Sequence, residues 1–386
     1  MNKNIVIVGA GFGGIAAAKY LAKQKKKLKG HQIYLIDKKK NYEFLPMLPD
    51  LIAGWLEPEA ISLNLKKFSQ KRGINFVCDS VQKIDREKKI VITKDQEISY
   101  QYLIIAAGSK TNFFGNRELA LNCRKLDSVK DALKIKSDLL NKAQQKKINI
   151  IVVGGGYTGL EIATNAHFLL TKHELPFSIT IVEKASEILK MVPNRIKQIA
   201  KSELDRLGIK ILTGDSLQSY KEGCVQLESG REVKNAFCIW SAGVKTSNFV
   251  QSLDAKKVKG RLVVNKSLNL KDRNDQSLFV VGDSAAYSTK IEESLRMAIM
   301  FATGQGKVAA KNIINNLQGK QSKTYKPIDL GYLIPLTYKK APGVVLGASV
   351  GPKIGYLLHY YMCFYRLEPG KKRKVWNAFL KKRMKR

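Results

Sequence analysis

The clearest pattern in the chain is an apolar run that stops at a glycine-rich turn and continues as small residues with helical spacing. Ile5–Val8 is the apolar run, Gly9–Gly14 reads G-A-G-F-G-G, and Ile15 opens the helical stretch. A buried strand, a tight turn and a helix are predicted, with glycines placed where the backbone must turn sharply and approach a pyrophosphate. The next apolar strand ends at Asp37, where a carboxylate accepts ribose hydroxyls. Together these features predict a dinucleotide site; a glycine-rich loop without a ligand is the alternative.

The same pattern returns in the middle of the chain. An apolar strand at 150–153 leads into the turn Gly154–Gly159, and a helix is expected from Leu160. A further apolar strand ends at Glu183. Gly154, Gly156 and Gly159 lie 145 residues after Gly9, Gly11 and Gly14, respectively. Repetition in register predicts two Rossmann-like units, one inserted in the other or following it.

Three other apolar strands are expected to end in small or acidic residues. Tyr102–Ser109 is one, 238–244 resembles it, and 278–281 precedes Gly282 and Asp283. The ends of parallel strands are where a dinucleotide crosses a sheet. Asp283 is either an acceptor for a sugar-like chain or a helix N-cap. A helix of small residues is expected after it, and a longer helix is expected over 295–313.

Several other segments have less regular patterns. Residues 42–49 are apolar with two prolines, which predicts an ordered loop or a broken helix that either packs in the core or walls the reactive ring. Short strands are expected at 74–78 and 89–93. Near the C-terminus, 330–336 and 344–350 are expected to be two strands, and the apolar, aromatic stretch after them is too short to span a bilayer, which needs about 18 residues.

The end of the chain is strongly basic. Residues 370–386 contain nine Lys and Arg and no acid, and on a helix Val375, Trp376, Phe379 and Leu380 share one face. This pattern is typical of a helix that lies in an anionic lipid interface. A solvated tail and a dimer helix are the alternatives. Nucleic acid is not favoured as a partner, because no binding module is recognisable.

Composition adds limits to this picture. The 386 residues are enough for two or three domains. The net charge of +36 comes from Lys and Arg that are mostly scattered, which for the body of the protein favours compositional drift over attraction to nucleic acid or a membrane surface. Five cysteines form no C-x-x-C motif, which fits a reducing compartment. The four histidines are scattered, so no metal site is expected. Because a strand is expected from Asn4, no signal peptide is expected.

Two dinucleotide sites in one chain imply two dinucleotides. Hydride transfer between a nicotinamide and a flavin is the chemistry that needs both. Asp37 and Glu183 each favour free ribose hydroxyls, hence FAD and NADH, although Lys184 leaves NADPH open. The expected fold class is therefore α/β, with two Rossmann-like dinucleotide-binding domains.

At this point the motifs carry a resemblance to a known family. Gly9–Gly14, Leu103–Gly115, Gly154–Ala163, 239–244 and 280–285 resemble the two-dinucleotide-binding flavoproteins, and within them the type II, non-proton-pumping NADH:quinone dehydrogenases. The resemblance implies an NADH domain inserted in a discontinuous FAD domain. The expected bounds are 1–113 and 241–324 for FAD, 114–240 for NADH, and 325–386 for C-terminal strands and a membrane-associating tail.

The resemblance also implies roles for single residues. Non-covalent FAD binding is expected at Gly9, Ala10, Gly11, Phe12, Gly13, Gly14, Asp37, Lys38, Val81, Ala107, Gly108 and Asp283. NADH binding is expected at Gly154, Gly156, Thr158, Gly159, Glu183, Ala242 and Gly243. Glu161, the expected catalytic residue, lies close to the nicotinamide–flavin contact in the family. Quinone binding is expected at Pro46, Met300, Gly304 and Gln305.

One departure concerns the quinone segment. The family usually carries glutamines in the stretch that corresponds to 299–305, whereas only Gln305 remains here, with Met300 and Gly304 at positions where polar residues are expected. Core packing of the helix is the alternative role for Met300. The departure leaves the identity of the quinone, and the use of a quinone at all, open.

The activity that the resemblance implies is hydride transfer from NADH to FAD and then passage of two electrons to a membrane quinone, without proton pumping. The enzyme is expected on the cytoplasmic face of the cell membrane as a peripheral protein, with a homodimer left open. The helix after the first turn has no cysteine pair, so electrons are expected to pass directly to an outside acceptor. Three alternatives remain: a soluble reductase of a protein partner, a sulfide:quinone reductase, for which Cys123 has no evident partner, and a nucleotide-binding sensor without turnover.

Overall fold

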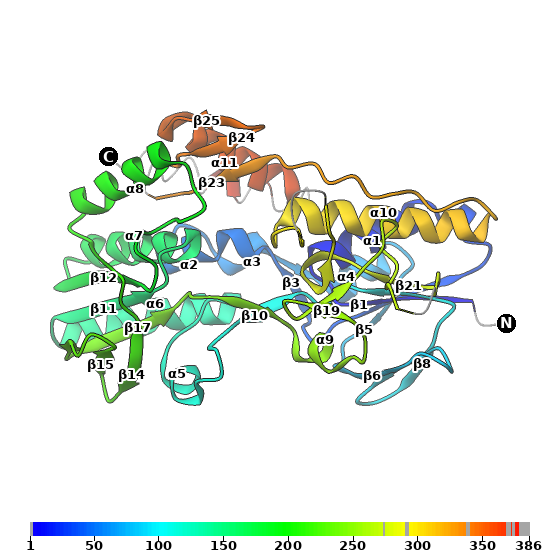
Figure 1. Ribbon diagram of the computed structural model, residues 1–386, viewed down its shortest axis with the longest axis horizontal. Coiled ribbons are helices and arrows are strands. Elements are labelled where there is room, and N and C mark those ends of the chain that lie inside the picture. Colours follow the sequence, from blue (N-terminus) through cyan, green and yellow to red (C-terminus); the bar gives the residue numbers. More distant parts are fainter. Residues whose placement is uncertain are drawn as a thin grey trace. The chain divides into compact units, whose positions relative to one another are not determined.

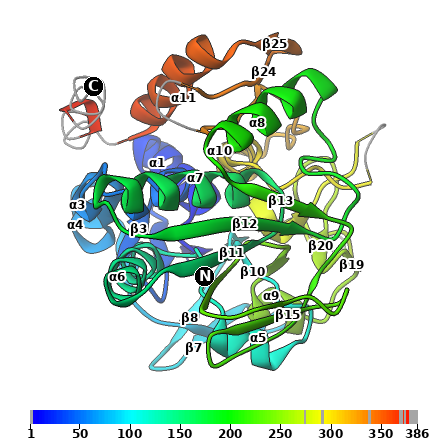
Figure 2. The same cartoon turned by 90° about the vertical axis from the view of Figure 1, so that its left-hand side faces the viewer.

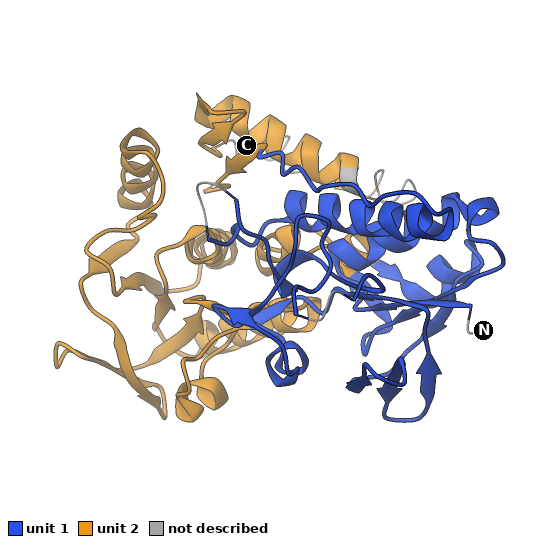
Figure 3. Ribbon diagram, turned by 45° about the vertical axis from the view of Figure 1, so that its right-hand side comes forward, with its two compact units in different colours: residues 1–42, 63–110, 245–329 blue, residues 43–62, 111–244, 330–386 orange. Residues whose placement is uncertain are grey.

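The computed structural model describes residues 3–272, 275–289, 293–336, 340–367, 372 and 375–377. The chain divides into two compact units, which Figure 3 shows in blue and orange. Unit 1 comprises residues 1–42, 63–110 and 245–329, and unit 2 comprises 43–62, 111–244 and 330–386. Each unit is therefore built from three separate stretches of sequence.

A five-stranded parallel sheet forms the centre of unit 1. Its strand order is β21 (Leu278–Val280), β9 (Tyr102–Ile105), β1 (Asn4–Val8), β2 (Gln32–Ile36) and β5 (Asn75–Val77). In register, Ile5 pairs with Ile33 on one side and with Tyr102 on the other. Nearly every side chain of β1 and β9 is buried, as expected for a parallel sheet with both faces covered. The glycine turn after β1 thus leaves the sheet between β2 and β9.

Two helices of unit 1 pack against each other and approach most closely at a glycine on each helix. Helix α1 (Phe12–Lys23) lies beside α10 (Ile299–Leu317), as Figure 1 shows. A Cβ placed on Gly306 would lie 2.1 Å from the carbonyl oxygen of Gly13. The two backbones are therefore in direct contact, and a glycine is required at this crossing.

Two elements around this helix pair differ from what the sequence predicts. Helix α10 begins at Ile299 rather than at residue 295, because Ala298 is extended (φ −148°) and the Leu295 amide donates to the Tyr287 carbonyl. The helix expected after Asp283 is a single 3-10 turn, η3 (Gly282–Ser284), followed by the short strand β22 (Ala285–Ala286). Pairing of β22 with β20 (Arg261–Val263) ends the helical turn.

The smaller elements of unit 1 surround this sheet. Of the short strands expected at 74–78 and 89–93, the first is β5 of the parallel sheet. The second is β7 (Ile90–Thr93), the middle strand of a three-stranded antiparallel sheet with β6 (Val81–Asp85) and β8 (Glu97–Ser99). Strand β6 was not expected, because its charged residues hide its alternation. The remaining elements are η1 (Lys25–Lys27), α4 (Leu65–Gln70), α9 (Asn248–Ser252) and β19 (Lys257–Val258).

Unit 2 repeats the architecture with a four-stranded parallel sheet. Its strand order is β13 (Lys210–Thr213), β12 (Phe177–Glu183), β11 (Ile148–Val153) and β17 (Ala236–Trp240). Figure 2 shows α7 (Tyr157–Lys172) running alongside β11 and β12. The other elements of this part of unit 2 are α5 (Arg117–Asn122), α6 (Val129–Gln145), α8 (Asn194–Arg206), β14 (Leu217–Lys221), β15 (Cys224–Leu227) and β16 (Glu232–Val233).

The first and last stretches of unit 2 are mostly helical. Residues 43–62 form η2 (Leu45–Met47), α2 (Leu48–Ile52) and α3 (Pro58–Ile61), so of the two alternatives for 42–49, a loop or a broken helix, the broken helix is found. The last stretch forms an antiparallel sheet of β23 (Gly331–Leu333), β24 (Gly343–Val345) and β25 (Ala348–Val350), followed by α11 (Pro352–Arg366). The single strand expected over 344–350 is wrong, since Leu346 and Gly347 have positive φ and turn the chain into a hairpin.

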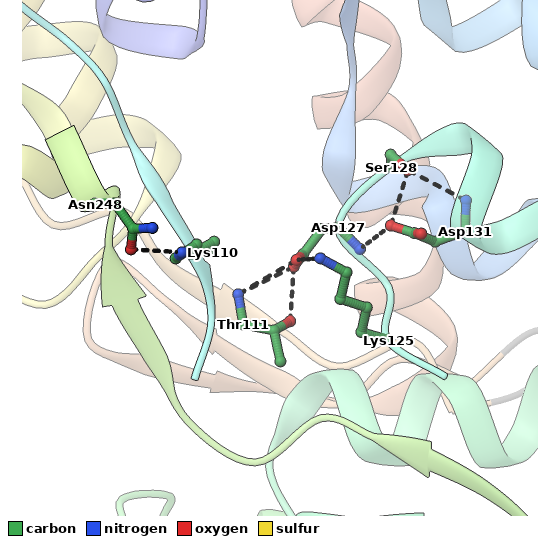
Figure 4. A network of polar contacts seen from close by, with 7 residues as sticks. All are labelled: Lys110, Thr111, Lys125, Asp127, Ser128, Asp131 and Asn248. Carbon is green, nitrogen blue, oxygen red and sulfur yellow. Dashed lines mark hydrogen bonds and ion pairs between the residues drawn. The ribbon is translucent and has the colours of Figure 1, made fainter. Parts of the chain in front are cut away.

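The chain passes between the units at short strands. The crossings fall inside β3 (Asn41–Glu43), β4 (Ser62–Asn64), β10 (Ser109–Thr111) and β18 (Val244–Thr246), with one more after Asp329. At the third crossing, the residue on each side of the boundary is hydrogen-bonded to a side chain of its own unit, as Figure 4 shows. Lys110 Nζ donates to Asn248 Oδ1 at 2.7 Å in unit 1, and Thr111 Oγ1 donates to Asp127 Oδ1 at 2.7 Å in unit 2.

The crossing of α1 and α10 gives a stability prediction. Gly306→Ala should lower the midpoint of thermal unfolding, followed by circular dichroism, because overpacking of this kind costs about 1–3 kcal/mol. Lys307→Ala, at an exposed position one residue along the same helix, is the control and should change the midpoint little. An unchanged or raised midpoint for Gly306→Ala would contradict the close backbone contact.

Candidate functional site

The first glycine turn has a geometry that only glycine permits. Gly9 has φ +99°, and a Cβ on it would lie 2.3 Å from the carbonyl oxygen of Ala106. A Cβ on Gly14 would lie 1.8 Å from the Gly9 carbonyl oxygen, so α1 starts directly against the turn. Gly11 faces open space, and the N-terminus of α1 has no side-chain cap. Uncapped amides beside open space fit a pyrophosphate at the positive end of the helix.

The second turn repeats this geometry in unit 2. Gly154 has φ +109°, and a Cβ on Gly159 would lie 1.9 Å from the Gly154 carbonyl oxygen. Gly156 again faces open space, and α7 again lacks a side-chain cap. The two helix N-termini are therefore equivalent, and each has the features of a phosphate cradle.

An acid at the end of the second strand ties each turn in place. In unit 1, Asp37 Oδ2 accepts from the Ala10 amide at 2.7 Å, and Oδ1 accepts from the Lys39 amide at 2.8 Å. In unit 2, Glu183 Oε2 accepts from the Gly155 amide at 2.6 Å and Oε1 from the Ala185 amide at 2.8 Å. A carboxylate has about four lone-pair sites, so both acids keep acceptor capacity for ribose hydroxyls.

Asp283 lies in a more buried setting in unit 1. Ser109 Oγ donates to Asp283 Oδ2 at 2.6 Å, and Arg261 Nε donates to the Asp283 carbonyl oxygen at 3.1 Å. Burial raises the pKa of Asp283, while the Ser109 hydrogen bond and the Arg261 charge oppose that rise. Sequence reasoning missed Ser109 and Arg261 as partners of this acid, because neither belongs to a spaced motif with it.

The predicted nucleotide residues separate cleanly between the two units. Every residue expected to bind FAD lies in unit 1, and every residue expected to bind NADH lies in unit 2, together with Glu161. Phe12 packs edge-on against Tyr42 at 5.5 Å, Lys38 is exposed, and Val81 begins β6 half-buried. In unit 2, Thr158 is exposed in the first turn of α7. Each unit thus carries a complete candidate set for one dinucleotide.

The end of β17 holds an aromatic residue that the sequence did not single out. Gly243 has φ +76°, and a Cβ on it would lie 2.5 Å from the Phe114 ring, which itself is 69% exposed. Trp240 Nε1 donates to the Ala242 carbonyl oxygen at 2.7 Å and fixes the strand end. The exposed ring beside Ala242 and Gly243 therefore belongs to the candidate nicotinamide nucleotide site.

Glu161 lies one turn into α7 and keeps part of its surface exposed. Burial of its carboxyl group raises the pKa of Glu161 well above its usual value, and the negative charge of Asp50 raises it further. A carboxyl group in this setting holds a proton at a pH where an exposed glutamate is ionised. It has the character of a proton donor beside a nucleotide-binding turn.

The residues expected to bind quinone do not form one group in either unit. Pro46 lies in unit 2, whereas Met300, Gly304 and Gln305 lie in unit 1 on α10. Gln305 is buried, and its Oε1 accepts from the Gly282 amide at 2.7 Å. Gly304 faces the Tyr325 ring, which a Cβ would approach to 3.2 Å. These contacts are internal to unit 1, and the quinone role of the four residues stays a prediction.

The cysteines do not resemble a redox relay. Cys123 does have a neighbour that the sequence did not reveal, because Cys238 Sγ lies 3.2 Å from its Sγ, and both residues are buried in unit 2. Burial raises the pKa of the Cys238 thiol well above its usual value. A buried, protonated thiol is a poor nucleophile, so this pair has the character of core packing.

Comparison with known proteins gives a consistent result. The model of the family described as pyridine nucleotide-disulphide oxidoreductase matches residues 3–306. A curated relative from Haemophilus influenzae named type II NADH:quinone oxidoreductase is 28% identical, with 88% of this chain and 86% of the relative covered.

Two solved structures share the fold. The Plasmodium falciparum NDH2 in complex with NADH has a TM-score of 0.87 at 17% identity, covering 100% of this chain and 99% of that one. A sulfide:quinone oxidoreductase from Aquifex aeolicus has a TM-score of 0.82 at 20% identity, covering 97% and 92%. The expected α/β fold class is confirmed.

The acid of the second turn allows a direct test of the NADH site. Glu183→Gln should raise the Kd for NADH roughly tenfold or more, because an amide cannot accept from two backbone N–H groups and also bind a ribose hydroxyl. The measurement is a fluorescence titration of purified protein with NADH. Glu228→Gln, at an exposed position of the same unit, is the control. Equal affinities in the two variants would remove Glu183 from the site.

Proposed function

Because the chain belongs to the pyridine nucleotide-disulphide oxidoreductase family, we propose that it is an FAD-dependent NADH:quinone oxidoreductase that does not pump protons. The observation that carries this proposal is the repeated nucleotide clamp, with Gly9–Gly14 and Asp37 in unit 1 and Gly154–Gly159 and Glu183 in unit 2. Two equivalent clamps on one chain serve two dinucleotides. The curated relative that spans most of the chain carries the corresponding name.

The domain assignment follows from the two clamps. FAD binds the domain formed by 1–113 and 241–324, and NADH binds 114–240. Support comes from the crossings between units after Lys110 and Val244, which lie within a few residues of these bounds. Residues 43–62 group with unit 2, so this loop accompanies the NADH side of the chain.

Each part of the chain contributes a separate step. Bound FAD supplies hydride acceptance from NADH and onward passage of two electrons. The turn at Gly9–Gly14, Asp37 and Asp283 hold the flavin nucleotide, and Phe114 and Glu183 contribute to the NADH side. Glu161 is the candidate proton donor of the reaction, because burial raises the pKa of its carboxyl well above the usual value.

The acceptor is an external quinone rather than an internal dithiol. Helix α1 contains no cysteine, and the Cys123–Cys238 pair is enclosed in the core of unit 2. A reductase of a protein partner and a sulfide:quinone reductase would share this fold. The likeness to the two solved structures therefore does not distinguish between these acceptors and donors. The curated relatives that cover most of the chain are named type II NADH:quinone oxidoreductase, which favours a quinone as the electron acceptor.

We place the protein at the cytoplasmic face of the membrane as a peripheral protein. Helix α11 exposes Ile354, Leu357, Tyr361 and Tyr365 along one stripe, with exposed fractions of 62%, 52%, 64% and 72%. Such a stripe, followed by nine Lys and Arg in 370–386, suits an anionic lipid surface. No helix in the described part of the chain has both the length and the apolarity to cross a bilayer.

The basic tail is only partly described. Trp376 is 49% exposed while Val375 is buried, so these two neighbours do not share an exposed face. Phe379 and Leu380 lie outside the described residues. The exposed stripe of α11 therefore carries more of the membrane proposal than the tail does.

The activity is tested with purified, FAD-loaded protein. Anaerobic addition of NADH should bleach the flavin absorbance, and menadione should restore it much faster than oxygen does. The rates are measured by stopped-flow absorbance. Reoxidation no faster by menadione than by oxygen would refute the quinone assignment, and an absence of bleaching would refute an NADH oxidoreductase altogether.

Membrane attachment is tested by sedimentation with lipid vesicles. The full chain should bind vesicles that contain phosphatidylglycerol, and a chain ending at Leu367 should bind them several-fold more weakly, because each basic residue contributes about 1 kcal/mol near an anionic surface. Replacing Leu357 and Tyr361 by Ser in the full chain should also weaken binding relative to the unchanged full chain, because the exposed apolar stripe of α11 is interrupted. Equal binding by all three proteins would contradict the proposed surface.

A further inference from the structure

The acid that follows β21 is held by side chains from three other elements of unit 1. Gln305 of α10 accepts through Oε1 from the Gly282 amide at 2.7 Å, and Ser109 of β10 donates through Oγ to Asp283 Oδ2 at 2.6 Å. Arg261 of β20 donates through Nε to the Asp283 carbonyl oxygen at 3.1 Å. The backbone before Asp283, the backbone after it and its carboxylate are thus each fixed by a different side chain.

Arg261 also ties Asp283 to the residues that precede α10. Its Nη1 donates to Ser294 Oγ at 2.8 Å and to the Leu295 carbonyl oxygen at 2.5 Å. The side chain is buried, and these three hydrogen bonds all go to uncharged oxygens. Neutral acceptors replace the hydration of a buried guanidinium only in part, so stability alone does not explain an arginine here. Its planar fork does fix several backbone groups at once, which indicates a positioning role.

Gln305 links the same acid to the first glycine turn. Its side chain is buried against the Gly282 amide, and the next residue, Gly306, is where the backbone of α10 meets Gly13. Adjacent residues of one rigid helix therefore set the spacing between the turn and Asp283. In FAD the pyrophosphate and the ribityl chain are neighbouring groups, so this spacing has to match the cofactor.

We propose that Asp283 is positioned for the ribityl chain of FAD by three side chains that act through it: Ser109, Arg261 and Gln305. This inference rests on the proposed function, in which Asp283 and the first glycine turn hold the flavin nucleotide. The three side chains give the carboxylate one orientation before the cofactor arrives, which lowers the entropy cost of binding. Gln305 then serves the flavin site rather than a quinone site, because its Oε1 is engaged by the Gly282 amide.

The exposed position of Ser109 allows a conservative test that does not disturb the core. Ser109→Ala removes the donor to the carboxylate and should raise the Kd for FAD about tenfold. Ser109→Thr keeps a hydroxyl on a strand that suits a β-branched residue, so its Kd should stay within about twofold of the unchanged protein. The Kd is measured by ultrafiltration of the holoenzyme, with free FAD in the filtrate quantified by fluorescence.

The two buried residues are tested against a matched control on α10. Arg261→Met and Gln305→Met should each raise the Kd for FAD about tenfold or more. Asn312 is equally buried, and its Nδ2 donates to the Ser267 and Lys323 carbonyl oxygens, away from the clamp on the acid. Asn312→Leu should therefore lower the midpoint of thermal unfolding, followed by circular dichroism, and leave the Kd for FAD unchanged.

Action through Asp283 is tested by combining substitutions. Once Asp283→Ala has removed the carboxylate, there is nothing left to orient, so adding Arg261→Met or Ser109→Ala should change the Kd for FAD by no more than about twofold. The effects of the same pairs on the unfolding midpoint serve as the comparison. A purely structural defect would add to the Asp283→Ala effect in both measurements.

The outcomes separate this inference from the proposed function. An unchanged Kd for FAD in the single variants, an Asn312→Leu variant that loses FAD as readily as Gln305→Met, or additive losses in the Asp283→Ala protein would each overturn the positioning role, even if NADH reduces menadione rapidly. Non-additive losses of FAD in a protein that reduces no quinone uphold the positioning role and overturn the proposed acceptor. A chain that takes up no FAD overturns both.

Discussion

Both units depend on one contact, in which the start of a helix lies directly against the backbone of the strand before it. In unit 1, the space between Gly14 and the Gly9 carbonyl is too small for any Cβ, and the same holds for Gly159 and Gly154. This closeness sets where the helix N-terminus points and leaves its amides without a side-chain cap. The uncapped amides are what make the turn a phosphate cradle, so packing and binding have the same structural cause.

The acid after each second strand links that cradle to the sugar site. Asp37 and Glu183 differ in length by one methylene, yet each uses one oxygen on the glycine turn and the other on the residue two positions further along. An acid in this position orders the loop before any ligand arrives. Each acid keeps further acceptor capacity for a ligand, and an ordered loop favours a preorganised nucleotide site.

Sequence alone predicted those parts of the fold that depend on local patterns. Both glycine turns, their acids and the strands around them were placed correctly, because strand periodicity and glycine spacing act over short distances. The errors lie where a distant contact decides the local structure. The Tyr287 carbonyl delays the start of α10, and pairing of β22 with β20 replaces a helix with a strand. The partner of Cys123 is 115 residues away, at a distance that no motif spans.

The candidate catalytic group shows the same division between local and distant information. Glu161 follows the second glycine turn and could be picked from its motif, but its raised pKa is a property of the folded unit, since it comes first from burial and then from the negative charge of Asp50. Asp50 accepts a hydrogen bond from the Tyr360 hydroxyl at 2.7 Å, and these two residues are 310 positions apart in the sequence. The duplicated clamps are thus the same in backbone, and the difference between the units lies in the side chains that surround them.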